Sequence, residues 1–426
     1  MNSMAKKIGW MLYGQGGRLV FQTIYFLGLA FVFSTSEYGI YVSVTALIVI
    51  LSPFCGLGFN SLIVKIISTD EKNFPRIFGN TIKITVYTYL ALLLIGLSAI
   101  LLIFNTSRIA IMLFLIMSLA DLLLLKFTEM SSQIFIAKGK VKISAHILNF
   151  ISIVRFLSIL IYIILSKLFL IFTGLINWAI VYLICSVLFT IIVFVFTLKK
   201  SEKPILRDKI KLHYIREGVY FSIGLSSQGV YNDVDKTLLG KYATLETTGL
   251  YGFAYKILDV MFIPVKAILA ITFPMFFRAG KEGGILETVK LSKKILIPLT
   301  IFTFLISLTA YFIVPLFINE FFYNKYAGSI EIFKLLLPIV ILRNIHYILA
   351  DAITGAGFQK ERSIIQIIVA GVNFILNLYL IKTYQVSGAI FASLFCDLLM
   401  VLLISILVWY KIKNTKLKNE VYNEIS

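Results

Sequence analysis

Long apolar runs recur along the whole chain and are separated by short polar connections. A helix that spans a bilayer needs about 20 apolar residues, and runs of that length fill most of the sequence. The pattern predicts twelve membrane-spanning helices. Their ranges are 9–33, 38–64, 77–104, 108–137, 142–166, 169–198, 214–240, 247–277, 292–318, 327–357, 362–382 and 385–410. Pro53, Pro264 and Pro338 break three of these runs, and such breaks either allow bending or only tolerate it.

The composition agrees with this pattern. Hydrophobic residues make up 59% and charged residues 14% of the chain, with a mean hydropathy of +0.93, whereas a soluble domain carries about 25% charged residues. Cys55, Cys185 and Cys396 each fall inside an apolar run, which argues against disulfides and a metal site. We predict an all-α integral membrane protein with no cofactor and no catalytic residue set, because no phosphate-binding glycine loop or Ser-His-Asp set is found.

Lys and Arg residues are distributed unevenly between the predicted loops. One set of alternate loops holds only Arg108, Lys167, Lys241, Lys325 and Lys382, whereas the other loops and the termini are strongly basic. Because Lys and Arg in short loops stay on the cytoplasmic side, both termini are predicted to be cytoplasmic. Topology and anionic lipid then account for most of the net charge of +19. No basic run interleaves with exposed aromatic residues, so we expect no nucleic-acid partner.

The longest polar connection, 199–213, divides the chain into halves of six spans each. The predicted parts are an N-terminal bundle (1–198), a cytoplasmic linker (199–213), a C-terminal bundle (214–410) and a basic cytoplasmic tail (411–426). Because six is even, the two bundles must run parallel to each other. Gly39 and Tyr41 recur as Gly249 and Tyr251, at an offset of 210 residues, which favours an internal repeat.

Polar residues form one stripe on the first helix of each predicted bundle. The stripes are Gln15, Arg18, Gln22 and Tyr25 in the first span and Gln228, Asn232 and Asp235 in the seventh. Steps of three and four residues place each set on one helix face, and the 210-residue offset pairs Arg18 with Gln228 and Gln22 with Asn232. A polar stripe on a spanning helix faces protein or water rather than lipid. We therefore expect both stripes to line a central hydrated cavity.

The segment NDVDKTLLGKYATLETTGLYGFAYKI (232–257) joins the seventh and eighth spans. With the chain length, the predicted helix count and the two halves, it resembles the polysaccharide exporters of the multidrug/oligosaccharidyl-lipid/polysaccharide flippase superfamily. The resemblance implies a V-shaped pair of six-helix bundles that works by alternating access. It also implies a polyprenyl-diphosphate-linked oligosaccharide, of the O-antigen repeat-unit type, as substrate. Membrane lipid and other membrane proteins of polysaccharide assembly are the further partners it implies.

Cations inside the predicted spans are candidate substrate-binding residues. A charge at the bilayer centre costs about 3 kcal/mol, so each one needs a reason. Arg18 lies about 13 Å deep in its helix and Arg155 is at a similar depth. Both suit a diphosphate, whose oxygens accept the guanidinium fork, although either could instead snorkel to the interface. Lys256 and Arg343 are the other candidate cavity cations, and Lys256 could instead be neutralised by Asp259.

Three acids are candidates for ion coupling: Asp235, Asp121 and Asp259. Asp235 extends the stripe of the seventh span, whereas Asp233 lies about 160° around the helix; Asp235 could instead cap the helix end. Lys126 and Glu129, three residues apart, are expected to pair. His346 fits a packed histidine as well as a proton carrier. With no nucleotide motif, energy must come from an ion gradient, the membrane potential or the substrate gradient.

We predict that the protein flips a polyprenyl-diphosphate-linked oligosaccharide from the cytoplasmic to the periplasmic leaflet of the bacterial inner membrane, for cell-surface polysaccharide synthesis. One alternative is a cation- or proton-coupled drug exporter of the same superfamily. It would need an acidic cavity, whereas the deep residues of the first half are chiefly Arg18 and Arg155. The other alternative is a membrane-embedded polysaccharide polymerase. Such enzymes usually carry their reactive residues on a large outer loop, and the longest one predicted here, near 319–326, has about eight residues.

Overall fold

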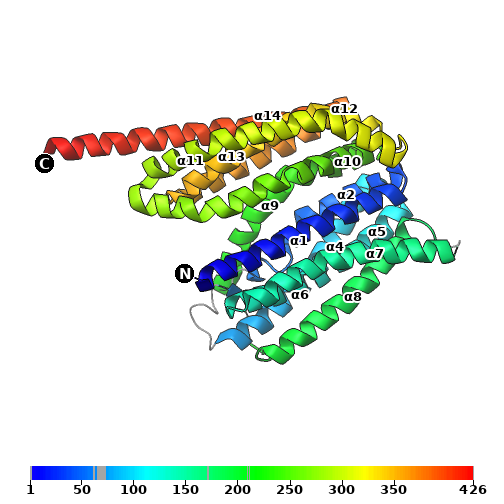
Figure 1. The fold of residues 1–426 in the computed structure, drawn as a ribbon. Helices are drawn as coiled ribbons and strands as arrows, with labels where there is room; N and C mark the ends of the chain where they lie inside the picture. The colour runs from blue at the N-terminus through cyan, green and yellow to red at the C-terminus, as the bar shows by residue number, and fades with distance from the viewer. Residues whose placement is uncertain are drawn as a thin grey trace. The chain divides into compact units, whose positions relative to one another are not determined.

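The computed structural model describes residues 2–60, 63–64, 73–169, 172–208, 210 and 212–425. Every regular element in these ranges is a helix (Figure 1). The contacts between Cα atoms divide the chain into two units, Met1–Gly249 and Leu250–Ser426. The all-α class predicted from the hydrophobic pattern is confirmed.

The first unit consists of long helices that pack along one another. They are α1 (Asn2–Val32), α2 (Thr35–Leu51), the short 3-10 turn η1 (Ser52–Phe54), α4 (Phe74–Phe104), α5 (Arg108–Ser118), η3 (Leu119–Leu124), α6 (Leu125–Ala137), α7 (Val141–Leu168), α8 (Leu175–Lys200) and α9 (Leu212–Tyr242). Helix α7 packs against α1, α6 and α8, and α9 packs along α2. Ser34 starts α2 with a capping box, because its hydroxyl accepts from Glu37 N while the Glu37 carboxylate accepts from Ser34 N.

The range 108–137, which the sequence predicts as one span, contains a widened turn. Its three elements α5, η3 and α6 follow each other without a gap, and η3 is π-helical. The amide N–H of Leu125 bonds to the carbonyl of Ala120, five residues earlier. A π-helical turn holds one residue more than an α-helical turn and is frequent at functional sites. Here it carries Asp121.

The second unit is built from α11 (Ile263–Phe322), α12 (Gly328–Leu336), α13 (Pro338–Gly355) and α14 (Gln359–Ile425); α10 (Leu245–Met261) joins it to the first unit. Two of these helices are interrupted by non-helical backbone, α11 at Gly283 and Gly284 and α14 at Gln385. Each of them therefore comprises two helical segments. Helix α13 packs against both α11 and α14.

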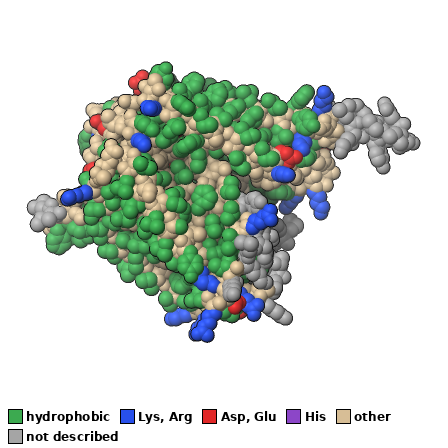
Figure 2. Space-filling view, turned by 180° about the vertical axis from the view of Figure 1, so that it is seen from behind, with side chains coloured by type: hydrophobic (Ala, Val, Ile, Leu, Met, Phe, Trp, Pro, Cys, Tyr) green, Lys and Arg blue, Asp and Glu red, His purple; other side chains and the backbone are tan. Residues whose placement is uncertain are grey.

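The outer surfaces of both units are apolar. Leu94, Ile192 and Leu316 expose 67%, 67% and 65% of their surface, and hydrophobic side chains cover broad stretches of the face in Figure 2. In the described part of the chain, eight helices are long and apolar enough to cross a membrane. They are Thr35–Phe54, Phe74–Phe104, Arg108–Ala137, Val141–Leu168, Leu175–Lys200, Ile263–Phe322, Gly328–Gly355 and Gln359–Thr415. The chain is a multi-pass membrane protein, and the count of twelve spans stays a prediction.

Three predicted helix breaks are found at the expected prolines. Pro53 lies in η1, directly after α2; Pro264 lies in the first turn of α11, directly after α10; and Pro338 opens α13, directly after α12. Proline has no amide hydrogen and its ring excludes the preceding helical turn, so a helix ends or restarts there. These breaks are confirmed.

The predicted linker is held against the first unit. The amide of Ile205 donates to the carbonyl of Pro75 (2.8 Å), and Arg76 Nε lies 2.9 Å from Asp208 Oδ2. The division at Gly249 differs from the bundle boundary predicted at 199–213, because α9 packs along α2 and the Ser43 hydroxyl donates to the Lys236 carbonyl (3.1 Å). The two-bundle arrangement itself stays a prediction.

Candidate functional site

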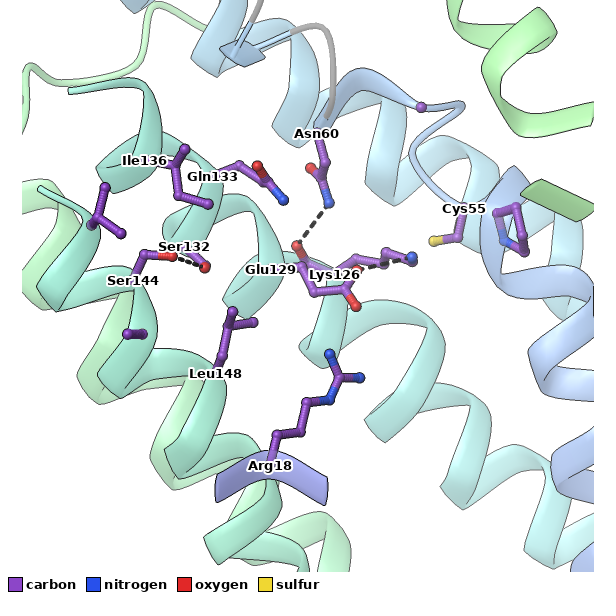
Figure 3. A pocket seen from close by; sticks show the side chains of 14 residues that line it. Arg18, Cys55, Asn60, Lys126, Glu129, Ser132, Gln133, Ile136, Ser144 and Leu148 are labelled. Carbon is purple, nitrogen blue, oxygen red and sulfur yellow. Dashed lines mark hydrogen bonds and ion pairs between the residues drawn. The ribbon is translucent and has the colours of Figure 1, made fainter. Parts of the chain in front are cut away.

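The first unit contains a cavity of about 490 Å³ between α1, the segment after α2, α6 and α7, which we call the first-unit cavity (Figure 3). This volume is in the roughly 300–1,000 Å³ range of small-molecule sites. Its lining residues are Arg18, Pro53, Cys55, Gly58, Asn60, Lys126, Glu129, Ser132, Gln133, Ile136, Val141, Ser144, Ala145 and Leu148. Polar side chains from four separate segments therefore meet in one cavity of this unit.

Arg18 extends from α1 into the first-unit cavity, toward Lys126 and Glu129 (Figure 3). Within the described part of the chain, its guanidinium has no hydrogen bond and no ion-pair partner within 4.0 Å. Close packing of α1 on α7 positions this side chain. Gly17 contacts the side chain of Asn149, which leaves no room for a Cβ, and Asn149 Nδ2 donates to the Tyr13 carbonyl (3.2 Å). Arg18 is thus a cavity cation whose hydrogen-bonding capacity is available.

Lys126 and Glu129 face Arg18 from α6. Lys126 Nζ lies 3.0 Å from Glu129 Oε2, so the predicted pair is confirmed. Asn60 Nδ2 donates to the Lys126 carbonyl (3.5 Å), and the hydroxyls of Ser132 and Ser144 lie 2.6 Å apart and link α6 to α7. Sequence reasoning recognised the ion pair but missed its place in the cavity. The signal was present, since Lys126, Glu129 and Gln133 form a polar stripe at steps of three and four.

Arg155 has a different environment. Its Nη2 donates to Asp121 Oδ1 (2.7 Å) and its Nε donates to the Tyr182 hydroxyl (3.1 Å), which in turn donates to Asp121 Oδ1 (2.6 Å). Trp178 stacks on Tyr182 with the ring centroids 5.9 Å apart. The side chains of Arg155 and Asp121 are 17% and 12% exposed. This closed network joins η3, α7 and α8, and Arg155 does not line the first-unit cavity.

The remaining polar residues of α1 differ in burial. Tyr25 is 3% exposed, and its hydroxyl lies 3.4 Å from the Tyr41 hydroxyl. Gln22 is half-buried. The side chain of Gln15 lies outside the described residues. At the C-terminal end of the predicted stripe, Tyr25 is therefore packed against other side chains.

The predicted stripe on α9 runs from an exposed end to a buried one. Gln228 is exposed, Asn232 is half-buried and Asp235 is 3% exposed. Asp235 Oδ1 accepts from Lys236 N (2.7 Å), and Lys236 Nζ contacts Asp233 Oδ1 at 2.6 Å. Asp233 is the more accessible acid, with 21% of its side chain exposed. Asp235 is thus the more buried of the two acids, and its predicted place on a central cavity stays a prediction.

The second unit has its own polar network. The Asp397 side chain, 1% exposed, lies 3.5 Å from Arg343 Nε and 3.4 Å from His346 Nε2. Arg343 also lies over the Tyr255 ring at 5.5 Å. Lys256 and Asp259 are paired at 3.7 Å, with 38% and 41% of their side chains exposed. Arg343 therefore holds a buried carboxylate, as Arg155 does, whereas Lys256 is partly accessible.

Solved structures of membrane transport proteins share the fold of this chain. A multidrug resistance MATE family transporter of the MOP superfamily, in an inward-facing conformation, superposes on 95% of this chain and 96% of its own, with TM-score 0.72 and 14% identity. The lipid II flippase MurJ, in an inward closed conformation, superposes on 93% of this chain and 86% of its own, with TM-score 0.73 and 16% identity. These likenesses show that the chain shares the fold of these transporters.

The sequence identifies the family of the chain. The chain belongs to the polysaccharide biosynthesis protein family, whose model matches residues 4–279. Among curated proteins it is similar to the teichuronic acid biosynthesis protein TuaB of Bacillus subtilis (strain 168), with 28% identity over 131 residues. That match covers 29% of this chain and 27% of the length of that relative. The resemblance to the polysaccharide exporters is confirmed.

Proposed function

We propose that this protein flips a polyprenyl-diphosphate-linked oligosaccharide from the cytoplasmic to the outer leaflet of a bacterial inner membrane, for synthesis of a cell-surface polysaccharide. One observation carries the proposal: an arginine with an available guanidinium lies in a membrane-embedded polar cavity of a polysaccharide biosynthesis family member. The fold shared with the lipid II flippase MurJ supports it, because that protein flips a lipid.

The lining of the first-unit cavity suits the head group of such a lipid. The planar fork of Arg18 matches two phosphate oxygens, and Lys126 supplies a second cation. The amides of Asn60 and Gln133 can donate to and accept from sugar hydroxyls. The polyprenyl tail would remain in the bilayer, because moving an apolar chain from lipid into a polar cavity is unfavourable.

The other cations and acids predicted from the sequence are not assigned to the first contact with the substrate. Arg155 and Arg343 already hold Asp121 and Asp397, so we assign the first contact with the diphosphate to Arg18. Roles for Arg155, Arg343 and Lys256 in substrate binding stay predictions. The same is true of ion coupling at Asp235, Asp121 or Asp259. We infer cytoplasmic termini from the Lys and Arg distribution, and transport without catalysis from the fold.

A second candidate function is export of cationic drugs. Glu129 supports it, because a carboxylate on the cavity wall could hold a cation, and the fold is shared with multidrug transporters. The two functions depend on residues of opposite charge in the first-unit cavity. A diphosphate needs Arg18, whereas a cationic drug needs Glu129 and is repelled by Arg18.

The test uses the full chain in vesicles that contain either a fluorescent polyprenyl-diphosphate N-acetylglucosamine or a cationic dye. Flipping of the diphosphate lipid is expected, and Arg18→Ala should slow it by about tenfold to a hundredfold, because one charge-assisted hydrogen bond contributes about 1.5–3 kcal/mol. Arg108→Ala, at the exposed start of α5, is the matched control and should transport normally. Dye export without lipid flipping, and faster in Arg18→Ala, would replace the proposal by the second candidate.

A further inference from the structure

Glu129 is the one carboxylate among the described residues that line the first-unit cavity. It is 3.0 Å from Lys126, on the same helix face, and the Arg18 side chain points toward the pair (Figure 3). The side chains of Lys126 and Glu129 are 14% and 28% exposed, so both keep some access to the cavity. The next cation, Arg155, is already held by Asp121 and Tyr182. The described part of the cavity wall thus carries two cations and one anion.

This arrangement means that the empty cavity presents fewer free cations than its composition suggests. While Glu129 holds Lys126, Arg18 is the cation that remains, among the described lining residues, for an entering anion. A carboxylate oxygen and a phosphate oxygen are the same kind of partner for an ammonium group, so both can occupy the same place beside Lys126. A diphosphate that bridges two sugar or lipid groups carries two negative charges. It therefore needs both Arg18 and Lys126 for charge balance.

We propose that Glu129 is a built-in competitor for the phosphate site. Its carboxylate occupies Lys126 while the cavity is empty, gives way to a phosphate group when the substrate enters, and takes Lys126 back when the substrate leaves. This inference rests on the proposed function, since it requires a diphosphate in the first-unit cavity. Glu129 is then a residue that sets how tightly and for how long the substrate is held.

The energetic consequence is a site that binds less tightly and releases faster. In the loaded cavity, the displaced carboxylate lies next to the anion in surroundings of low dielectric constant, where like charges repel strongly. The repulsion weakens binding and favours departure. A transport site has to be occupied and then emptied in every cycle, so very tight binding would slow it. Glu129 would thus lower the affinity and raise the turnover.

The test measures binding and transport in Glu129→Gln. The probe is farnesyl diphospho-N-acetylglucosamine, with the full chain in lipid nanodiscs. Loss of the competing charge should lower Kd by about tenfold or more and also lower the maximal transport rate. Glu129→Met, uncharged and of similar length, should behave in the same way. Glu287→Gln is the control, because Glu287 also pairs with a lysine three residues on, Lys290, but the two side chains are 42% and 69% exposed.

Competition and simple repulsion are separated in a Lys126→Gln background. If Glu129 competes for Lys126, Glu129→Gln should increase the affinity much less when Lys126 is absent. An equal gain in both backgrounds would overturn the inference, as would unchanged or weaker binding in Glu129→Gln and Glu129→Met. In either case the wild-type protein would still bind the probe and the proposed function would stand. A farnesyl glycoside without the diphosphate serves as the neutral comparison ligand. If the wild-type protein does not bind the probe more tightly than this glycoside, both the inference on Glu129 and the proposed function are overturned.

Discussion

Arg18 and Arg155 lie on helices that pack along each other, yet they have opposite surroundings. Both are deep in predicted spans and both were predicted to be cavity cations. In the structure Arg155 is closed off by Asp121 and Tyr182, whereas Arg18 points into the first-unit cavity. The difference lies in the neighbouring helices. An acid reaches Arg155 at 2.7 Å, and within the described residues no acid reaches Arg18 within 4.0 Å.

This comparison separates two uses of an intramembrane charge. A buried ion pair with further hydrogen bonds holds helices in one arrangement, and loss of one partner leaves the other charge uncompensated. A cation without an acidic partner contributes little to packing and can bind a ligand. Depth in the membrane therefore does not identify a substrate site; the absence of an internal counter-charge is the better indicator. The following predictions test that distinction, in order of decreasing effect on stability.

The largest effect is expected for Arg155→Ala. Removal of the guanidinium leaves Asp121 buried without its counter-charge, which costs about 3–5 kcal/mol, and the temperature of half-unfolding in detergent should fall by roughly 10 °C. The double variant Arg155→Met with Asp121→Leu should recover most of this loss, because no charge is then left unpaired. A single variant as stable as the wild-type protein would show that the two arginines do not differ in this way.

A smaller effect is expected for Asp397→Asn in the second unit. The amide keeps the shape of the side chain but removes the charge beside Arg343 and His346, and we expect a loss of about 1–3 kcal/mol. The loss should be smaller than for Arg155→Ala, because these contacts are longer, at 3.4–3.5 Å. Thermal unfolding of both variants side by side measures this. A larger loss at Asp397 would place the tighter network in the second unit.

The smallest effect on stability is expected for Arg18→Ala. Because Arg18 has no hydrogen bond or ion pair with any described residue, its removal should change the free energy of unfolding by about 0.5 kcal/mol or less. Thermal unfolding of the purified protein should therefore match the wild-type curve while transport falls. A loss of stability close to that of Arg155→Ala would mean that Arg18 also serves packing, and the contrast between the two arginines would disappear.

The hydrophobic pattern predicted much of the helical framework. The range 108–137 is helical over its full predicted length, and the breaks at Pro53, Pro264 and Pro338 are where they were expected. These features depend on local properties: the apolar run length, and the missing amide of proline. The chain division could not be predicted in the same way. It depends on the packing of α9 along α2, which no local pattern encodes.

The candidate site was only partly predictable, for a related reason. Spacing indicated the Lys126–Glu129 pair, because both residues lie on one helix. It could not show that Asp121 meets Arg155, since 34 residues separate them and the contact depends on how two helices pack. Nor could it place the cavity, whose wall depends on the close approach of Gly17 to Asn149. Each missing element is a contact between helices rather than a property of one.

The π-helical turn η3 has a consequence for how this chain should be aligned with its relatives. A π turn corresponds to one inserted residue in an α-helix. In this chain the extra residue lies between Asp121 and the stripe of Lys126, Glu129 and Gln133. Deletion of Leu123 would restore an α-helical turn and leave the residues after it on nearly their present face, because the wide turn absorbs the extra residue. An alignment without a one-residue gap in 119–124 would therefore match each residue of the stripe to a position about 100° around the helix in any relative that lacks the insertion.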